Sequence, residues 1–296
     1  MIAPARVLFG YFPIPEANAY SQILEQAKLA DELGLDLIAI QDHPYQWRFL
    51  DALTLLTSIA VQTKRIRVLP DVVNLQMRPP ALVAKWAASL DVMTGGRVEL
   101  GLGAGAFPAA VAAMGAEARE PGDAVSALEE AIAVIRLLWS GQRGARFDGR
   151  FYQLRGVNAG PVPAHPIGIW LGAYRPRMLG ITGRLADGWL PSLGPMKLEA
   201  LNDANRLIDD AATAAGRNPG DILRIINIGG RITDGESSGL LNGPVDQWVE
   251  QLTELTVDYG MDGYILAAGE NPQEQLRRFA NDVAPRVHEN LALVKR

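Results

Sequence analysis

Short apolar runs alternate with longer stretches of helical periodicity along the chain, and this alternation limits the possible folds more than any other feature. Eight of the runs have the length and the β-branched or aromatic content of buried strands. They are residues 7–12, 37–41, 66–69, 97–102, 167–171, 188–190, 223–228 and 263–266. Helical stretches between them are typical of repeated βα units around a parallel sheet. Eight units in 296 residues predict a (β/α)8 TIM barrel of the α/β class.

Two segments depart from this rhythm. Residues 104–124 are rich in Ala, Gly and Pro, and residues 146–154 resemble a hairpin because Asp148-Gly149 lies between apolar flanks. We therefore expect an insertion after the fourth strand, and a mobile loop at the Gly-rich residues 233–243 after the seventh. No linker divides the chain, so residues 1–296 are interpreted as one domain. An open doubly wound sheet is the disfavoured alternative, since no G-x-G-x-x-G follows the first strand.

Composition favours a small molecule as the partner. The net charge of −5 comes from 28 basic and 33 acidic residues that are interspersed, so no basic face suits nucleic acid. The absence of cysteine excludes disulfides and thiolate chemistry, and no histidine motif for a metal is present. No apolar run is long enough for a membrane span, and the first residues do not resemble a signal peptide. We expect a cytoplasmic protein.

The residues that follow the strands are mostly Gly or Ala, which leaves room for a flat ring at the barrel mouth. His43 is the exception, because it is the one histidine of three at a strand end, and it follows Asp42. An imidazole beside a carboxylate suits general acid–base chemistry. The alternative is that Asp42 caps the next segment and His43 only packs. His165 is interpreted as structural, at the opposite face, and His288 as solvated on the last helix.

The sequence "GAYRPR" at residues 172–177 is a second candidate. A helix that begins at Pro176 would direct free backbone amides at the barrel mouth, where they could bind an anion or a phosphate. Arg175 and Arg177 lie nearby in the sequence, although a solvated surface charge is an equally acceptable interpretation of both.

Two further motifs carry a family resemblance. Residues 84–105, "AKWAASLDVMTGGRVELGLGAG", resemble the bacterial luciferase-like superfamily of flavin- and deazaflavin-dependent oxidoreductases. Residues 166–191, "PIGIWLGAYRPRMLGITGRLADGWLP", are similar to the second signature of that superfamily. The resemblance extends over essentially the whole chain. It implies a (β/α)8 barrel with an insertion, which is often a homodimer.

Asp42-His43 with Trp47 is similar to the motif of the branch that uses the deazaflavin coenzyme F420, as in glucose-6-phosphate dehydrogenases of that type. The resemblance implies that His43 exchanges a proton and that Trp47 lies beside the substrate. It also implies a cis peptide between Asp71 and Val72 behind the coenzyme ring. The implied coenzyme-binding residues are Asp71, Val72, Asn74, Gly103, Gly105, Gly172, Ala173, Tyr174 and Arg175. The implied substrate-binding residues are Phe12, Trp47 and Phe107.

One position departs from that branch, whose sugar-phosphate dehydrogenases carry a Glu where this chain has Ala106, followed by Phe107. A buried Phe beside the ring would disfavour unpaired hydroxyls, so we expect a fairly apolar substrate. The first hypothesis is hydride transfer between F420 and a small organic molecule. The alternatives are an FMN-dependent monooxygenase that uses O2, and a non-catalytic binder of flavin or an apolar ligand. A flavin or F420 reductase is a possible partner.

Overall fold

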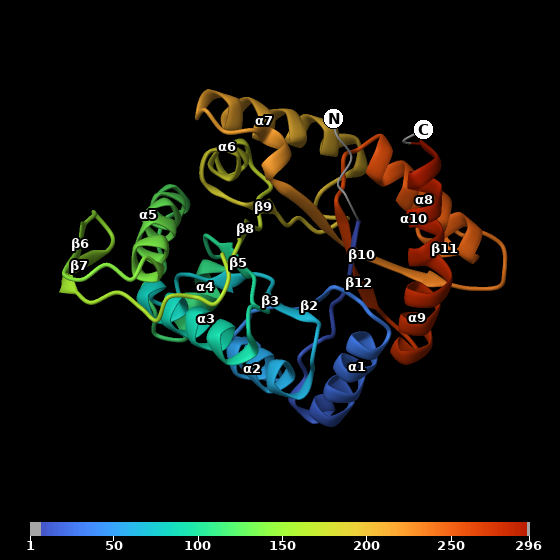
Figure 1. Ribbon diagram of the computed structural model, residues 1–296, viewed down its shortest axis with the longest axis horizontal. Helices are drawn as coiled ribbons and strands as arrows, with labels where there is room; N and C mark the ends of the chain where they lie inside the picture. The colour runs from blue at the N-terminus through green and yellow to red at the C-terminus, as the bar shows by residue number, and fades with distance from the viewer. Residues whose placement is uncertain (1–6, 295–296) are drawn as a thin grey trace.

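The computed structural model describes residues 7–294, and eight of its strands surround one axis in parallel (Figure 1). They are β1 (Leu8–Tyr11), β2 (Leu37–Ile40), β3 (Arg67–Pro70), β5 (Leu100–Gly103), β8 (Ile169–Leu171), β9 (Gly188–Trp189), β10 (Leu223–Ile232) and β12 (Gly263–Ala268). Hydrogen-bonded neighbours follow the order β3, β2, β1, β12, β10, β9, β8 and β5. Every strand lies close to its predicted position, with ends that differ by a few residues.

The barrel closes between β3 and β5 through a single isolated bridge, which pairs Val68 with Val98. The N–H of Glu99 donates to the Val68 carbonyl at 3.0 Å, and the N–H of Val68 donates to the Arg97 carbonyl at 2.9 Å. Beyond this bridge the short strand β4 (Val73–Asn74) pairs with β5 in place of β3. The predicted (β/α)8 barrel is confirmed. The sequence did not reveal β4, since two residues carry no periodicity.

Helices cover the outside of the barrel (Figure 1). They are α1 (Tyr20–Glu32), α2 (Ala52–Gln62), α3 (Pro80–Thr94), α5 (Pro121–Trp139), α6 (Pro176–Leu185), α7 (Leu201–Ala214), α8 (Val245–Val257), α9 (Pro272–Arg278) and α10 (Ala284–Val294). Proline at the first position starts α3 and α6, and Gly95 ends α3 with φ of 69°. Asp51 caps α2 by accepting from the Thr54 N–H at 2.8 Å. No helix within residues 7–294 combines the length and the apolar character that crossing a membrane requires.

The inside of the barrel is packed with side chains. One apolar cluster fills it, formed by Leu37, Ala39, Leu69, Trp170, Leu190, Ile225 and Ile265. The indole of Trp170 occupies the space beside Gly188, where an added Cβ would lie 2.7 Å from its Cδ1 atom. The barrel is therefore not a channel, and a ligand has room only at an end.

The additional elements after β5 are α4 (Pro108–Ala113), which precedes the barrel helix α5, and a hairpin of β6 (Ala145–Asp148) and β7 (Gln153–Val157), which follows it. The hairpin projects away from the barrel beside α5, as predicted (Figure 1). Glu130 on α5 anchors it, because its carboxylate accepts from the backbone N–H groups of Arg150 and Phe151 at 2.9 and 2.8 Å. In the Gly-rich segment 233–243, β11 (Asn242–Gly243) pairs with the end of β10. The mobility of that segment stays a prediction.

The two histidines outside the barrel mouth have structural partners. The Nδ1 atom of His165 lies 2.7 Å from the fully buried carboxylate of Asp91, as a structural residue should. The prediction that His288 is solvated was wrong. Its Nε2 atom lies 3.0 Å from the Val7 carbonyl and its ring packs edge-on against Phe9, so α10 places the imidazole against residues 7–9.

The packing of β5 against the end of β3 leads to a testable prediction. A Cβ on Gly101 would lie 2.2 Å from the Pro70 carbonyl oxygen and 3.0 Å from Val72 Cγ1. We expect Gly101→Ala to lower the free energy of unfolding by about 1–3 kcal/mol or more, as measured by urea denaturation. Gly122→Ala is the control, because nothing lies within 4 Å of its added Cβ. Equal stability of both variants would contradict the close approach.

Candidate active site at the carboxyl end of the barrel

A cavity of about 430 Å³ opens where the barrel strands end. It brings together most of the residues that the sequence singled out, namely Phe12, Asp42, His43, Asp71, Val72, Asn74, Gly103, Gly105, Gly172, Tyr174 and Arg175. Sequence reasoning did not select several other lining residues, namely Gln41, Tyr45, Val73, Ala104, Met178, Leu190, Ser192 and Asn227. Trp47, Phe107 and Ala173 do not line it.

His43 is half-buried at the end of β2, and its partner is Tyr45. The His43 Nδ1 atom lies 2.6 Å from the Tyr45 hydroxyl. Burial lowers the pKa of His43, while the charge of Asp42 acts in the opposite direction. Burial also raises the pKa of Tyr45 to about 12, so the phenol keeps its proton. The imidazole is thus held in place and predominantly neutral near pH 7, the form that accepts a proton at its free ring nitrogen and can return it once protonated. No sequence pattern marks Tyr45 as this partner.

Asp42 is not the hydrogen-bond partner of His43 that the sequence suggested. The residue is 3% exposed, and its carboxylate accepts two bonds from the Arg78 guanidinium, both at 2.8 Å. The N–H of Asn74 donates to it at 3.1 Å. Neighbouring residues at a strand end point to opposite sides, so Asp42 turns toward the chain that follows β3 while His43 turns into the cavity. Asp42 caps no helix either, since Asp51 does that for α2.

The floor of the cavity is built from one valine between glycines. The peptide between Asp71 and Val72 is cis, as the resemblance implied. A Cβ on Gly103 would lie 2.7 Å from Val72 Cγ2, and one on Gly172 would lie 3.2 Å from the same atom. Because these strand ends carry no side chains, the Val72 side chain fits between them and no side chain of Gly103 or Gly172 projects over it.

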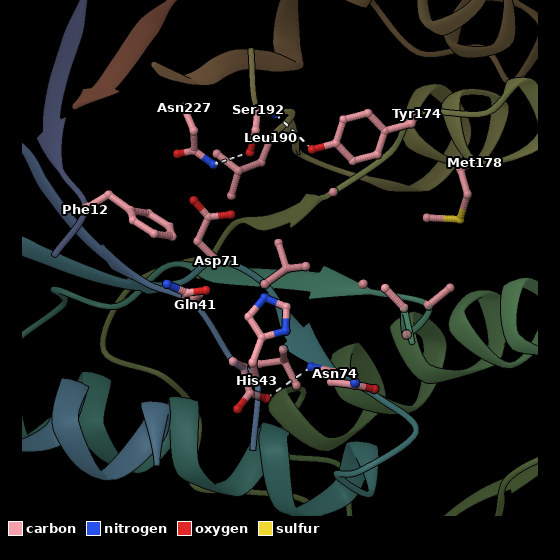
Figure 2. A pocket seen from close by; sticks show the side chains of 18 of the residues that line it. Phe12, Gln41, His43, Asp71, Asn74, Tyr174, Met178, Leu190, Ser192 and Asn227 are labelled. Carbon is pink, nitrogen blue, oxygen red and sulfur yellow. Dashed lines mark hydrogen bonds between the residues drawn. The ribbon is translucent and has the colours of Figure 1, made fainter. Parts of the chain in front are cut away.

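One oxygen of the acidic group beside this floor lacks a hydrogen-bond partner. Figure 2 shows the Asp71 carboxyl group pointing toward Asn227, with Phe12 nearby. Neither Asp71 Oδ2 nor Asn227 Oδ1 has a hydrogen-bond partner within residues 7–294, although both atoms are shielded from solvent. The Asn227 amide donates to the Ser192 hydroxyl at 3.2 Å. Burial raises the pKa of Asp71 to about 7, against the effect of a hydrogen bond from Asn227.

The rim of the cavity next to α6 combines a fixed tyrosine with an exposed cation. The Tyr174 hydroxyl accepts from the Ser192 N–H at 2.9 Å, so it links the ends of β8 and β9 (Figure 2). Arg175 is exposed immediately before α6, as the anion-site hypothesis requires. Arg177 does not join it, because its guanidinium donates to Gly122 and Ser126 on α5. Ala173 is buried, and its carbonyl accepts from the Trp189 indole at 2.9 Å.

Two predicted substrate residues lie elsewhere. The Trp47 side chain is 88% exposed, with the Arg48 guanidinium 5.8 Å from its ring, so the structure does not bring it to the cavity. Phe107 was expected to be buried but is 59% exposed. Its ring packs edge-on against His43, with centroids 5.9 Å apart, from a residue with φ of 59° that precedes α4. The loop after β5 therefore places Phe107 at the outer rim.

The raised pKa of Asp71 predicts how stability depends on pH. Between the ordinary value of 3.8 and about 7, folded Asp71 holds a proton that the unfolded chain has lost. This contribution to the free energy of unfolding therefore falls as the pH rises through that interval. In Asp71→Asn the fall is absent, so we expect the variant to gain stability relative to the parent between about pH 5 and pH 8. Urea denaturation at both pH values measures it. Exposed Asp203→Asn should show no such trend.

The fold and the cavity together define a class of protein, the (β/α)8 barrel enzymes, whose reactions take place at the carboxyl ends of the strands. Residues 7–237 match the family described as luciferase-like monooxygenase. The chain therefore belongs to the bacterial luciferase-like family, and it is an oxidoreductase.

Individual relatives agree with this assignment. The chain is 30% identical over 237 residues to an F420-dependent glucose-6-phosphate dehydrogenase of Microbacterium testaceum, a match that covers 77% of this chain and 68% of the relative. It is 32% identical over 228 residues to the enzyme of that name from Kineococcus radiotolerans, with 74% and 66% covered.

Solved structures share the fold. An F420-dependent secondary alcohol dehydrogenase in complex with an F420–acetone adduct superposes with a TM-score of 0.85 at 18% identity, over 95% of this chain and 99% of that one. A monooxygenase from Streptomyces bottropensis gives a TM-score of 0.81 at 21% identity, over 94% and 99%. At such identities the likeness concerns the fold alone.

Proposed function

We propose that this protein transfers a hydride between coenzyme F420 and a small organic substrate, and that His43 exchanges the accompanying proton. The observation that carries the proposal is the position of His43, which faces a cavity floored by Val72 and glycines in a chain similar to F420-dependent dehydrogenases. The coenzyme would supply the hydride acceptor or donor, while the protein supplies position and proton transfer.

The residues present fit a flat ring with a phosphate-bearing side chain. The surface over Val72 would hold the ring, because Gly103 and Gly172 have no side chains that would project into this space. The free amides at the start of α6, with Arg175 beside them, would hold the phosphate. The unpaired polar atoms of Asp71 and Asn227 offer hydrogen bonds to a bound molecule.

His43 is suited to the proton transfer. The Tyr45 hydroxyl at Nδ1 fixes the plane of the ring, which leaves Nε2 as the atom that meets a ligand. A positioned imidazole whose pKa lies below its ordinary value is an effective base at neutral pH. Tyr45 orients His43 and need not exchange the proton itself.

We propose a fairly apolar substrate. Ala106 lines the cavity, so no carboxylate is available from that position. Phe12, Met178 and Leu190 contribute apolar surface, which disfavours unpaired hydroxyl groups. The homodimer, the reductase partner and the cytoplasmic location expected from the sequence stay predictions.

Titration with each coenzyme tests the proposal. Purified protein is mixed with F420 and, separately, with FMN, and binding is followed by absorbance and fluorescence. Reduction of bound F420 is then assayed with a panel of alcohols, aldehydes and sugar phosphates. We expect F420 to bind more tightly and an apolar alcohol or aldehyde to react faster than glucose 6-phosphate. Tight FMN binding without F420 binding would favour the monooxygenase alternative, and binding without turnover would favour a non-catalytic binder.

A further inference from the structure

The Asp71 carboxyl group lines the cavity but has no part in the proposed role of His43. Its Oδ2 atom lies out of contact with solvent, and no donor from residues 7–294 reaches it. Asn227 Oδ1 is likewise buried without a hydrogen-bond donor from residues 7–294, and both residues line the cavity. Buried acceptors of this kind are costly unless a ligand or water supplies the missing donor. The position thus favours a molecule that brings a proton-bearing polar group.

The other charged or titratable groups of the cavity do not satisfy Asp71. They are Asp42, His43 and Tyr45 after β2, and Tyr174 and Arg175 after β8. Asp42 is bound by Arg78, and His43 by Tyr45. The Tyr174 hydroxyl is engaged with the Ser192 N–H, and Arg175 lies exposed at the rim. On the side of β9 and β10, Asp71 faces only the neutral groups of Ser192 and Asn227.

Proton balance calls for a second group beside His43, if the proposed function holds. When an alcohol is oxidised, its C–H bond breaks with the electron pair going to the deazaflavin as hydride. Its O–H bond also breaks, and the proton goes to a base while the C=O bond forms. One proton must further reach a nitrogen of the reduced ring. Two sites thus change protonation, and a carboxyl group at residue 106 is absent because Ala106 stands there.

We propose that Asp71 is this second proton-exchanging group, which binds a polar N–H or O–H group of the molecule in the cavity and exchanges one proton with it. The partner atom is either a ring nitrogen of the coenzyme or the hydroxyl oxygen of the substrate. The inference rests on the proposed function. Burial raises the pKa of Asp71 to about 7, so both protonation states are accessible under ordinary conditions.

The test compares Asp71→Asn with Asp262→Asn. Asp262 is a matched control, because burial raises its pKa too, but it lies outside the cavity at the start of β12, where it accepts from the Arg224 N–H at 2.8 Å. The dissociation constant of F420 is measured by fluorescence between about pH 5.5 and pH 8.5. The reduction rate of bound F420 is measured over the same range with the best alcohol of the panel. Asp71→Ser serves as a second variant if Asp71→Asn folds poorly.

Two results would support the proposal, and they show whether the partner of Asp71 is the coenzyme or the substrate. If Asp71 serves the coenzyme, F420 affinity changes about tenfold across neutral pH in the parent and in Asp262→Asn, but not in Asp71→Asn. If it serves the substrate, F420 affinity is alike in all three proteins and reduction slows on the order of 100-fold in Asp71→Asn alone.

If Asp71→Asn and Asp262→Asn have the same F420 dissociation constants and the same reduction rates over the whole pH range, Asp71 is not the second proton-exchanging group. A parent protein that does not bind F420 would instead refute the proposed function. The same pH titration is then made with FMN. If FMN affinity depends on pH in the same way in the parent, Asp71→Asn and Asp262→Asn, the role of Asp71 is refuted as well.

Discussion

His43→Ala is expected to lower the rate of F420 reduction roughly 100-fold or more, the range found when a general acid or base is removed. F420 affinity should change little, because the floor over Val72 and the start of α6 do not depend on the imidazole. Stopped-flow reduction of bound F420 measures the rate, and fluorescence titration measures the affinity.

The control for this variant is His288→Ala. His288 is bound to the Val7 carbonyl on the far side of β1 and does not line the cavity, so its replacement should leave reduction intact. If His43→Ala and His288→Ala retain the same rate, His43 has only a packing role. A parallel loss of rate and of coenzyme affinity in His43→Ala would make it a binding residue.

Arg78→Met should be the most destabilising of the substitutions considered. It removes both side-chain donors from Asp42, whose carboxylate is 1% exposed, and leaves a buried charge without its cation. Breaking a buried pair in this way costs about 3–5 kcal/mol. The loss is measured as the change in the free energy of unfolding in urea. Because Asp42 holds the backbone of Asn74, the end of the cavity near β4 should loosen as well.

Arg48→Met is the matched control, since the Arg48 side chain is 61% exposed and lies 3.9 Å from the Glu16 carboxylate. An exposed pair of this kind contributes about 0–1 kcal/mol. Asp42→Asn combined with Arg78→Met should recover part of the lost stability, because no unpaired buried charge then remains at residue 42. Only the partly exposed Asp51 carboxylate, which Arg78 also pairs with, still lacks its cation. Equal losses in Arg78→Met and Arg48→Met would mean that the Asp42 pair contributes little.

The sequence predicted the barrel well because periodicity is a local property. Within each strand or helix the buried side chains recur at a fixed spacing. Pro176 starts α6 and Gly95 ends α3 because of the backbone conformation that each residue type favours. The position of His43 followed for a related reason, since the end of a predicted strand is enough to place a residue at the barrel mouth.

Side-chain partners were predicted less well. Asp42 was paired with its neighbour His43 in the sequence, whereas its partner Arg78 lies 36 residues further along. Asn227 and Ser192 meet only because β9 and β10 are adjacent in the closed barrel. Trp47 and Phe107 lie in loops, where no periodicity states which way a side chain turns. Contacts set by the tertiary fold leave no signal in a single sequence.

The isolated bridge between Val68 and Val98 has a mechanical consequence for the active site. β3 and β5 are joined by this bridge alone and share no ladder, and beyond it β4 pairs with β5. Asp71 and Val72 occupy the interval between the two pairings, where the Val72 side chain fills space that a side chain on Gly101 or Gly103 would need. The barrel wall beneath the cavity therefore has an interval without ladder hydrogen bonds between β3 and β5. The shape of one aliphatic side chain, that of Val72, fills this interval.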